Sequence, residues 1–406
     1  MRFAFVTTEF PTTRPTSGGL SSYVARMSRL LAESGHEVEV FVSTQGKAES
    51  LRYHGCRVQH VPTVTGPVWR LVTGVLRNTG LEHLGMKRAW LAHARAMAQA
   101  VAKADAKTPF DVVHSADHRG IGRLIARRPG RLHLVRCSAA MDLYMAADGS
   151  SNRAARVQIA LEAETVARAD LAIAPSEFTA RHYSARLGRR VEVLRPPAYL
   201  EVAPALAPAW LPPRYLLHFA GHLMRRKGTE LIAEALKIAL QQEPGLTMLW
   251  VGRMDFGAMH DLLAPLGEKA GQVIPLYPQG KRALYAMIGN AACVVLPSLV
   301  DNLPNTVIES LILGVPVIGS RNSSIEELVE HGVDGILIEN GSVEDLARAM
   351  VSAWRGTLPL QPGRQWISSE MARPFQPEQV LDAYLDIIAR PESRNPAPVQ
   401  PNGTTI

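Results

Sequence analysis

The feature that most constrains the fold of this chain is a predicted strand–helix–strand unit in its last third. Cys293–Leu296 is a short apolar run with β-branched residues at its centre, which is typical of a strand buried on both faces. Thr306–Leu313 has the composition of a helix, and Gly314 is placed to end it. A second apolar run, Val315–Ile318, follows at once. Two buried strands joined by a helix predict a parallel sheet and therefore an α/β fold.

The loop Ser298–Asn305 of this unit is where we expect a ligand, because ligands of parallel sheets bind beyond the carboxyl ends of the strands. Asp301 lies in the loop, Asn305 is placed to cap the helix, and Glu309 falls in its first turn. The unpaired N–H groups of a helix start favour an anion. Carboxylates accept hydrogen bonds from vicinal hydroxyls. An anion flanked by polyols describes a nucleotide-sugar. The structural alternative is that Glu309 only stabilises the helix dipole and that Asp301 is an ordinary loop residue.

The stretch also resembles the Glu-x7-Glu signature of retaining family-4 glycosyltransferases of GT-B fold. Pro297-Ser298, Asp301, Glu309 and Gly314–Val317 fall at the spacing of that family. Two departures are visible: the first acid is aspartate, and the family's Gly-Phe-Gly-Leu-Pro is replaced by Asn302-Leu303-Pro304-Asn305-Thr306. The resemblance implies that Glu309 holds the ribose and Asp301 the donor-sugar hydroxyls, with Asn302, Asn305 and Thr306 as further donor-binding residues.

Composition sets broad limits on the class of protein. A chain of 406 residues is long enough for two domains, and 47% hydrophobic with 20% charged residues is ordinary for a globular protein. The three cysteines are far apart, which predicts reduced thiols in a cytoplasmic protein. No signal peptide, apolar run of membrane-spanning length or nucleic-acid motif is visible. The net charge of +7 fits an anionic donor, an anionic acceptor or a membrane surface, and does not choose between them.

A glycine pair near the N-terminus is a second candidate ligand site. Phe3–Thr7 is predicted to be a strand, and apolar residues recur with helical period over Leu20–Leu31. Gly18 and Gly19 lie between these elements, where glycine lets the backbone approach a ligand closely. In the family that the chain resembles, such a loop lies opposite the donor diphosphate.

The segment Gly66–Lys107 interrupts the βα alternation and carries seven Lys and Arg against two acids, a net charge of +5. A basic amphipathic helix can lie on an anionic membrane. The alternative is a helical insertion with solvated arginines. Some relatives in the family dock on membranes through this region, so the resemblance implies peripheral contact with the inner membrane face as one of the two interpretations.

The acceptor side is less well marked. Asp111–His114 is predicted to be a strand and its exit, followed by Asp117 and His118, and Leu132–Ser138 is the next strand. The family often places a histidine at the end of that strand, where this chain has Ser138. His114, Asp117, His118, Arg136 and Ser138 are therefore the acceptor-side candidates, although a lone histidine in a loop is usually structural.

A cationic loop opens the predicted second domain. Strand Tyr215–Ala220 and helix Thr229–Gln241 flank Gly221-His222-Leu223-Met224-Arg225-Arg226-Lys227-Gly228. Three cations between a strand and a helix can bind a diphosphate. The family pattern is Gly-Arg-x4-Lys-Gly, so Lys227 matches its lysine and His222 stands in place of its arginine. The alternative is a solvated basic loop.

The resemblance implies two Rossmann-like α/β domains of GT-B fold facing a central cleft. Residues 1–195, completed by a helix at 377–390, form the acceptor domain, residues 196–213 a proline-rich linker, and residues 214–376 the donor domain. The tail 391–406 is predicted to be disordered.

The predicted reaction is transfer of a sugar from a nucleoside-diphosphate sugar, such as a UDP-sugar, to an acceptor hydroxyl on a saccharide, a lipid-linked glycan or a small natural product, with retention of configuration. Lys227, Asp301 and Glu309 are the catalytic candidates. No Asp-x-Asp occurs, so we expect no metal or other cofactor, and Lys227 with the nearby Arg225 and Arg226 would neutralise the diphosphate. A nucleotide-sugar epimerase and an inactive nucleotide-sugar-binding protein remain as alternatives.

Overall fold

The computed structural model describes residues 1–13, 18–63, 82–138, 140–150, 152–277, 280–360 and 366–390. Apart from these gaps, residues 1–142, 152–196 and 377–390 form one compact unit, and residues 143–150 and 197–376 form another. The chain passes between the units at Pro196–Pro197, within the proline-rich segment. Two predictions lie outside the described residues: the disordered tail 391–406, and the 66–81 part of the basic segment.

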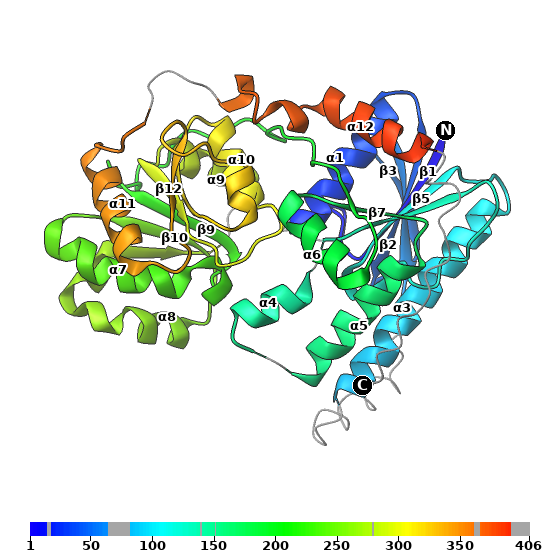
Figure 1. The fold of residues 1–406 in the computed structure, drawn as a ribbon, viewed down its shortest axis with the longest axis horizontal. Helices are drawn as coiled ribbons and strands as arrows, with labels where there is room; N and C mark the ends of the chain where they lie inside the picture. The colour runs from blue at the N-terminus through cyan, green and yellow to red at the C-terminus, as the bar shows by residue number, and fades with distance from the viewer. Residues whose placement is uncertain are drawn as a thin grey trace. The chain divides into compact units, whose positions relative to one another are not determined.

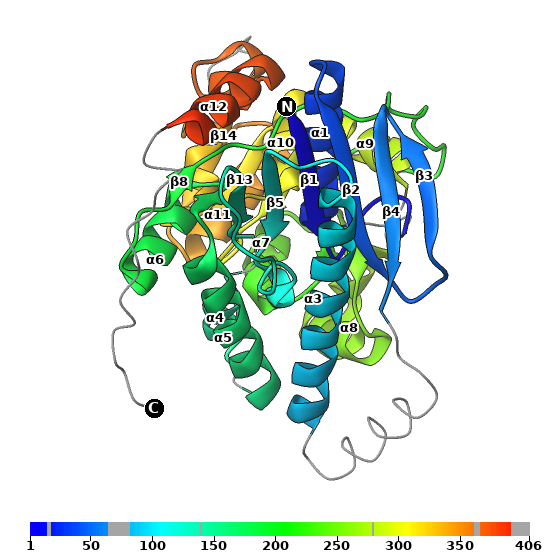
Figure 2. The same cartoon turned by 90° about the vertical axis from the view of Figure 1, so that its right-hand side faces the viewer.

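The first unit is built on an eight-stranded sheet with the order β3-β4-β2-β1-β5-β6-β7-β8. The central strand β1 pairs in parallel with β2 and β5, and its apolar residues are buried, as its sequence predicts. The hairpin β3–β4 at one edge is antiparallel (Figure 2). The sequence analysis missed β3 because its side chains are mostly exposed and carry no apolar alternation. The strands are β1 (Arg2–Thr7), β2 (Glu37–Thr44), β3 (Glu49–Tyr53), β4 (Cys56–Pro62), β5 (Val112–Ala116), β6 (Leu132–Arg136), β7 (Leu171–Ala174) and β8 (Glu192–Val193).

Helices cover both faces of this sheet. α1 and α12 share one core cluster with β1 and β2, through Met27 and Leu31 of α1 and Val380 and Tyr384 of α12. α3 packs on the other face through Met97. The helix that the apolar period of Leu20–Leu31 predicts is confirmed by α1. The helices are α1 (Gly19–Glu33), α3 (Glu82–Asp105), α5 (Arg153–Arg168), α6 (Glu177–Leu187) and α12 (Pro377–Ala389), and α4 (Met141–Ala147) starts in this unit.

The second unit has an all-parallel sheet of six strands with the order β11-β10-β9-β12-β13-β14. α7 lies on one face, and α9 and α10 lie on the other (Figure 1). The strands are β9 (Leu216–His222), β10 (Met248–Arg253), β11 (Val273–Leu276), β12 (Cys293–Leu296), β13 (Val317–Ser320) and β14 (Gly335–Ile338), and the helices are α7 (Thr229–Gln242), α8 (Phe256–Leu263), α9 (Lys281–Gly289), α10 (Asn305–Ile312) and α11 (Val343–Arg355).

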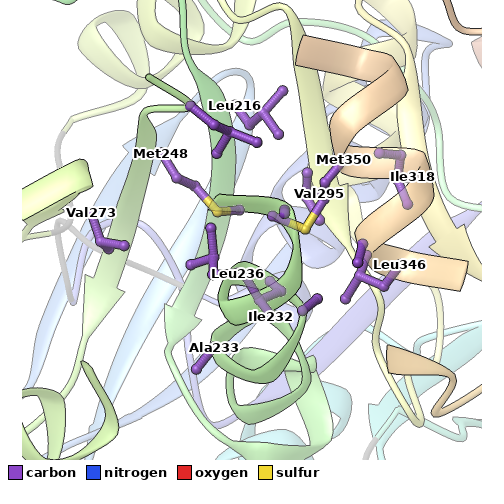
Figure 3. Close-up of a cluster of buried hydrophobic side chains, with 14 of the residues drawn as sticks. Leu216, Ile232, Ala233, Leu236, Met248, Val273, Val295, Ile318, Leu346 and Met350 are labelled. Carbon is purple, nitrogen blue, oxygen red and sulfur yellow. The ribbon is translucent and has the colours of Figure 1, made fainter. Parts of the chain in front are cut away.

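The larger core of the second unit lies between the sheet and the pair α7 and α11. Ile232 and Leu236 of α7 and Met350 of α11 are buried against Leu216 and Val295 of the sheet (Figure 3). Burial of each such side chain contributes about 1.5–3 kcal/mol. This packing fixes the carboxyl ends of β9 and β12 beside one another and so positions the loops that follow them.

Two local predictions from the sequence of the second unit, a helix over Ser324–Glu330 and a capping box at Ser342–Asp345, have different outcomes in the structure. The helix predicted over Ser324–Glu330 is a 3₁₀ turn, Ser324–Glu327, which Ser323 caps by accepting a hydrogen bond from the N–H of Ile325. It ends early because the chain turns back to β14 within a few residues. Ser342, in contrast, caps α11 as predicted, accepting from the N–H of Asp345 at 3.2 Å.

Candidate functional site

The loop between β12 and α10 carries the two acids of the motif. Helix α10 begins at Asn305, one residue earlier than predicted, and Pro304 precedes it, so Asn305 is not a cap. Proline fixes the extended backbone at the helix entry without any capping side chain. Glu309 consequently lies in the second turn rather than the first. The helix dipole acts mainly within the first turn, so it does not account for an acid at this position.

Asp301 is held from both sides of the loop. Its carboxylate accepts a 3.0 Å hydrogen bond from the N–H of Asn302, and its main-chain oxygen accepts one from the Ser324 hydroxyl at 2.8 Å. Its second carboxylate oxygen forms an ion pair with the ammonium group of Lys227. The side chains of Lys227 and Asp301 are 21% and 8% exposed, so solvent screens this pair only in part.

Lys227 reaches Asp301 because of the turn that precedes α7. Arg225–Lys227 forms a 3₁₀ turn, and Gly228 follows with φ +78°. A side chain at position 228 would be strained by that φ and would overlap the main-chain oxygen of Pro297, so only glycine fits between the two loops. The Lys-Gly pair of the motif therefore has one residue for charge and one for close packing.

Glu309 is paired with a lysine from a different helix. Lys281, the first residue of α9, places its ammonium on Oε1 of Glu309, and the hydroxyl of Tyr285 lies 3.3 Å from the same oxygen. The Glu309 side chain is 1% exposed. Each motif acid is thus bound by its own lysine within the second unit.

The other residues of the cationic loop are placed differently from one another. His222 is the last residue of β9 and is exposed; partial burial, then Arg253 and Arg226, lower its pKa. Arg225 is exposed and lies 3.9 Å from Glu230. Arg226 packs its guanidinium on the ring of Tyr144 and donates its main-chain N–H to Asp148 at 3.0 Å.

Residues 143–150, which the sequence places in the first domain, belong to the second unit, and these contacts join them to it.

Most of the other residues of the 301–310 segment are buried. Asn302 and Thr306 are 7% and 8% exposed, and the Thr306 main-chain oxygen accepts from the Ser310 hydroxyl at 2.7 Å. Asn305 is half-buried at the helix start.

An apolar cavity of about 530 Å³ lies at the carboxyl ends of β10 and β11. Its wall includes Gly252 near the end of β10, Met254 just after that strand, Leu263 of α8, and Leu276 and Tyr277 at the end of β11. The segment Tyr277–Lys281 is predicted from the sequence to border a nucleotide base, and residues 278 and 279 of it lie outside the described part of the chain. Tyr277 of the cavity wall and Lys281 both follow β11, four residues apart, whereas Glu309 follows β12.

In the first unit, the glycine pair opens α1. Gly18 precedes the helix with φ −76°, and Gly19 is the first helical residue. A Cβ at position 18 would make only an ordinary 3.4 Å contact with Glu9. Neither backbone strain nor crowding therefore requires glycine at position 18, and close approach of a ligand stays a prediction.

His114 was expected at the exit of its strand, but it lies in the middle of β5 and is 2% exposed. β5 runs two residues further than predicted, because Ser115 and Ala116 continue the parallel pairing with β6. Nδ1 of His114 lies 3.1 Å from the hydroxyl of Tyr384 on α12, and its ring stacks on Phe5. Burial lowers its pKa well below the usual value. His114 is therefore a core residue and not an acceptor contact.

Asp117 and Ser138 meet at the ends of β5 and β6. The Asp117 carboxylate accepts hydrogen bonds from the N–H and the hydroxyl of Ser138, both at 2.9 Å, and from the hydroxyl of Tyr183 at 2.6 Å. Arg136, the last residue of β6, is buried with its guanidinium 3.5 Å above the ring of Tyr23. The predicted candidates Asp117, Arg136 and Ser138 thus lie at one edge of the sheet.

His118 lies next to a buried acid that the sequence did not indicate. Its Nδ1 is 3.8 Å from Glu162, and burial, with Arg119 next, lowers its pKa to about 3. Burial, followed by the Asp117 carboxylate, raises the pKa of Glu162 to about 8. Burial and the Asp117 charge thus favour the protonated form of Glu162, and burial favours the neutral form of His118. Among the residues that the structure describes, no cluster of three or more His, Cys, Asp or Glu side chains could hold a metal ion.

Two family models together match most of the chain. Residues 18–199 match a glycosyl transferase 4-like domain, and residues 214–355 match the glycosyl transferases group 1. The chain is a group 1 glycosyltransferase. Its motif loop, Lys227 turn and cavity all fall within the second of these matches.

Three relatives of this glycosyltransferase are D-inositol 3-phosphate glycosyltransferases. A D-inositol 3-phosphate glycosyltransferase of Nocardiopsis dassonvillei is 29% identical over 407 residues, covering 91% of this chain and 89% of that protein. Proteins of the same name from Catenulispora acidiphila and Rhodococcus jostii are each 28% identical; they cover 80% and 86% of this chain, and this chain covers 79% and 78% of them.

Solved structures of the GT-B fold resemble this glycosyltransferase over its whole length. Sucrose-phosphate synthase from Thermosynechococcus elongatus has a TM-score of 0.71 at 18% identity, over 96% of this chain and 100% of that one. Anabaena HepE, in complex with UDP and glucose, has a TM-score of 0.65 at 17% identity, over 96% of this chain and 99% of that one. These likenesses confirm the predicted fold.

The sequence did not indicate four side chains that lie against predicted site residues. Lys281 and Tyr285 contact Glu309, and Tyr183 and Glu162 lie beside Asp117 and His118. For Lys281 and Tyr285 a signal exists: they are four residues apart in the helix that precedes the motif strand, so both can point to one place. No sequence signal marks Tyr183 or Glu162, whose partners are distant in the chain.

Proposed function

We propose that this glycosyltransferase moves a sugar from a UDP-sugar to an acceptor hydroxyl with retention of the anomeric configuration. The observation that carries the proposal is the arrangement at the carboxyl edge of the second sheet. An apolar cavity, a buried acid and a lysine–aspartate pair follow the strands there, in the second unit alone. These features suit a base, a ribose and a diphosphate with its sugar.

The cavity is assigned to the nucleobase. The side chains of its wall are apolar apart from His260 and the hydroxyl of Tyr277, and among the described residues lining it there is no carboxylate. Guanine offers two adjacent N–H donors that a carboxylate would recognise, so this lining favours the smaller uracil ring. Two structurally similar proteins, HepE in complex with UDP and a UDP-forming trehalose-phosphate synthase, support this choice.

Glu309 is assigned to the ribose and Lys227 to the diphosphate. Lys227 lies at the start of α7, where an anion is favoured and a cation is not, and without a donor its charge is met by Asp301. When a diphosphate enters, the ammonium can move to the stronger anion, leaving Asp301 to accept from the sugar hydroxyls. Negative charge on the diphosphate grows as the glycosidic bond breaks, so this contact strengthens in the transition state.

The leaving diphosphate is also the group that accepts the acceptor's proton in this proposal. Departure and attack then occur on the same face of the sugar, which gives retention. Asp117, Ser138 and Arg136 at the edge of the first sheet are the proposed acceptor-side residues, without His114. The relatives' name makes D-inositol 3-phosphate the first acceptor to test.

Peripheral contact with an anionic membrane is part of the proposal only for the described end of the basic segment. Leu84 and Met86 in the first turns of α3 are 45% and 38% exposed, next to the exposed Lys87 and Arg88. That combination suits an anionic lipid surface. Among the described residues, no helix has both the length and the apolar character needed to cross a bilayer.

The test is incubation with UDP- and GDP-sugars, with and without D-inositol 3-phosphate, followed by separation of nucleotides and sugars. Acceptor-dependent release of UDP with a new glycoside supports the proposal. Conversion of the donor to an epimer would identify a nucleotide-sugar epimerase. Binding of UDP-sugar without hydrolysis or transfer would identify an inactive binding protein.

A further inference from the structure

The helix that precedes the motif strand brings two side chains onto the acid assigned to the ribose. Lys281 and Tyr285 are one turn apart on α9, and both reach Oε1 of Glu309. The ammonium of Lys281 also lies 5.4 Å from the centre of the Tyr285 ring. The three groups form one contact set, although Glu309 comes from α10 and the other two from α9.

Lys281 occupies a place that is unfavourable for a cation. It is the first residue of α9, where the helix dipole opposes positive charge, and Gly280 before it provides no capping side chain. Glu309 is 1% exposed and needs a partner for its charge, since a buried carboxylate without one is costly. The lysine is therefore placed to serve the acid of α10 and not its own helix.

Tyr285 contacts the carboxylate from within the core. The residue is fully buried, so packing in the core of the second unit restricts its ring, and its hydroxyl lies 3.3 Å from Oε1 of Glu309. Lys281 is 31% exposed on its side chain, so it can follow the carboxylate when a ligand binds. One rigid and one adaptable donor on the same oxygen define the orientation of the acid.

We infer that Lys281 and Tyr285 are positioning residues that hold the Glu309 carboxylate in the orientation that binds the ribose hydroxyls. The inference rests on the proposed function, because it assumes that Glu309 binds the ribose. Two residues of α9, which lies outside the motif, would then contribute to the affinity for the donor. Neither residue contacts the breaking glycosidic bond in this assignment. Substitution of either residue should therefore raise KM for the donor and leave kcat nearly unchanged.

Steady-state kinetics with the UDP-sugar test this on the full chain. Loss of one charge-assisted contact predicts that Lys281→Met raises donor KM about 10- to 100-fold while kcat stays within about threefold. Tyr285→Phe raises KM by a smaller factor, and Lys281→Arg recovers part of the affinity. Arg282→Met is the matched control: it removes the neighbouring cation of α9 and leaves KM unchanged.

The same substitution made in the Glu309→Ala variant separates this inference from the proposed function. In Glu309→Ala the substitution Lys281→Met adds nothing further to KM, because the group that it positions is gone. Wild-type KM in Glu309→Ala alone overturns the ribose assignment. Raised KM in Glu309→Ala with wild-type KM in Lys281→Met overturns only the positioning role.

Folding is checked by thermal unfolding of each variant. If Lys281→Met does not fold, Lys281→Gln keeps a hydrogen-bond donor without the charge, and the same increase in KM is expected for it. A Lys281→Gln enzyme that loses stability but keeps wild-type KM and kcat contradicts the inference, because the pair would then serve only the fold.

Discussion

Replacing Lys227 by alanine removes the cation that the structure places between Asp301 and the start of α7. Both side chains of that pair are largely buried, so the lost interaction is worth about 1.5–3 kcal/mol for a charge-assisted bond. If the ammonium stabilises the departing diphosphate, the transition state loses about 2.7–4 kcal/mol, as for removal of a single oxyanion donor. We therefore expect kcat for transfer from a UDP-sugar to fall by about 10²- to 10³-fold, with a smaller rise in donor KM.

A second variant separates catalysis from simple neutralisation of Asp301. Lys227→Ala leaves the Asp301 carboxylate without its cation, which costs about 1–3 kcal/mol of stability. Adding Asp301→Asn removes that unpaired charge and should restore stability but not kcat. Lys237→Ala is the surface control, since Lys237 pairs with Glu234 on the exposed side of α7.

The assay is steady-state release of UDP at saturating acceptor, alongside thermal unfolding of each variant. A Lys227→Ala enzyme that folds and keeps near wild-type kcat refutes the reasoning. Recovery of kcat in the Lys227→Ala/Asp301→Asn double variant would also refute it, because Lys227 would then act only as a counter-charge.

Three further predictions concern the metal, the buried acid of the first unit and the membrane. Transfer should persist in EDTA, because Lys227 in place of an Asp-x-Asp metal site is proposed to neutralise the diphosphate; activity lost in EDTA and restored by manganese contradicts this. Burial, followed by the Asp117 charge, raises the pKa of Glu162 from 4.5 to about 8. Between these two pH values the folded state keeps a proton that the unfolded chain releases, so the stability of the folded state falls as the pH rises. In denaturant unfolding, the free energy of unfolding of Glu162→Gln should therefore rise relative to that of the wild type between these pH values, by up to about 1.4 kcal/mol per pH unit. A difference between the two free energies that does not change with pH would argue against a raised pKa. In flotation at low salt, the protein should rise with anionic but not neutral vesicles, and Leu84→Ser/Met86→Ser on α3 should weaken this; no flotation with anionic vesicles leaves the solvated-helix interpretation.

The fold was predictable because the strands of a buried parallel sheet are marked by their own composition. Cys293–Leu296 was predicted to the residue, since it is a short apolar run that ends at a turn signal. β3 was missed because a half-exposed edge strand need not be apolar. The predicted helix at 324–330 failed because tertiary connection, rather than local preference, ended it after one turn.

Site geometry was predictable only where one local motif contains it. Lys227 and Gly228 fall where the pattern places them, and the close approach of Pro297 explains the glycine. The partners of the acids could not be predicted, because ion pairs between residues far apart in sequence follow from packing. His114 shows the converse: its side chain is polar, yet the strand continues past it and α12 supplies its partner.

The most direct test of the account is a proton NMR time course of an α-linked UDP-sugar, chosen by the donor screen above, with D-inositol 3-phosphate and the protein. The account predicts that the α-anomeric signal of the UDP-sugar is replaced by UDP and an α-linked glycoside, and that Glu309→Ala and Lys227→Ala each slow this change. A β-linked product would contradict retention. An unchanged rate in both variants would contradict the assignment of the donor site to the second unit.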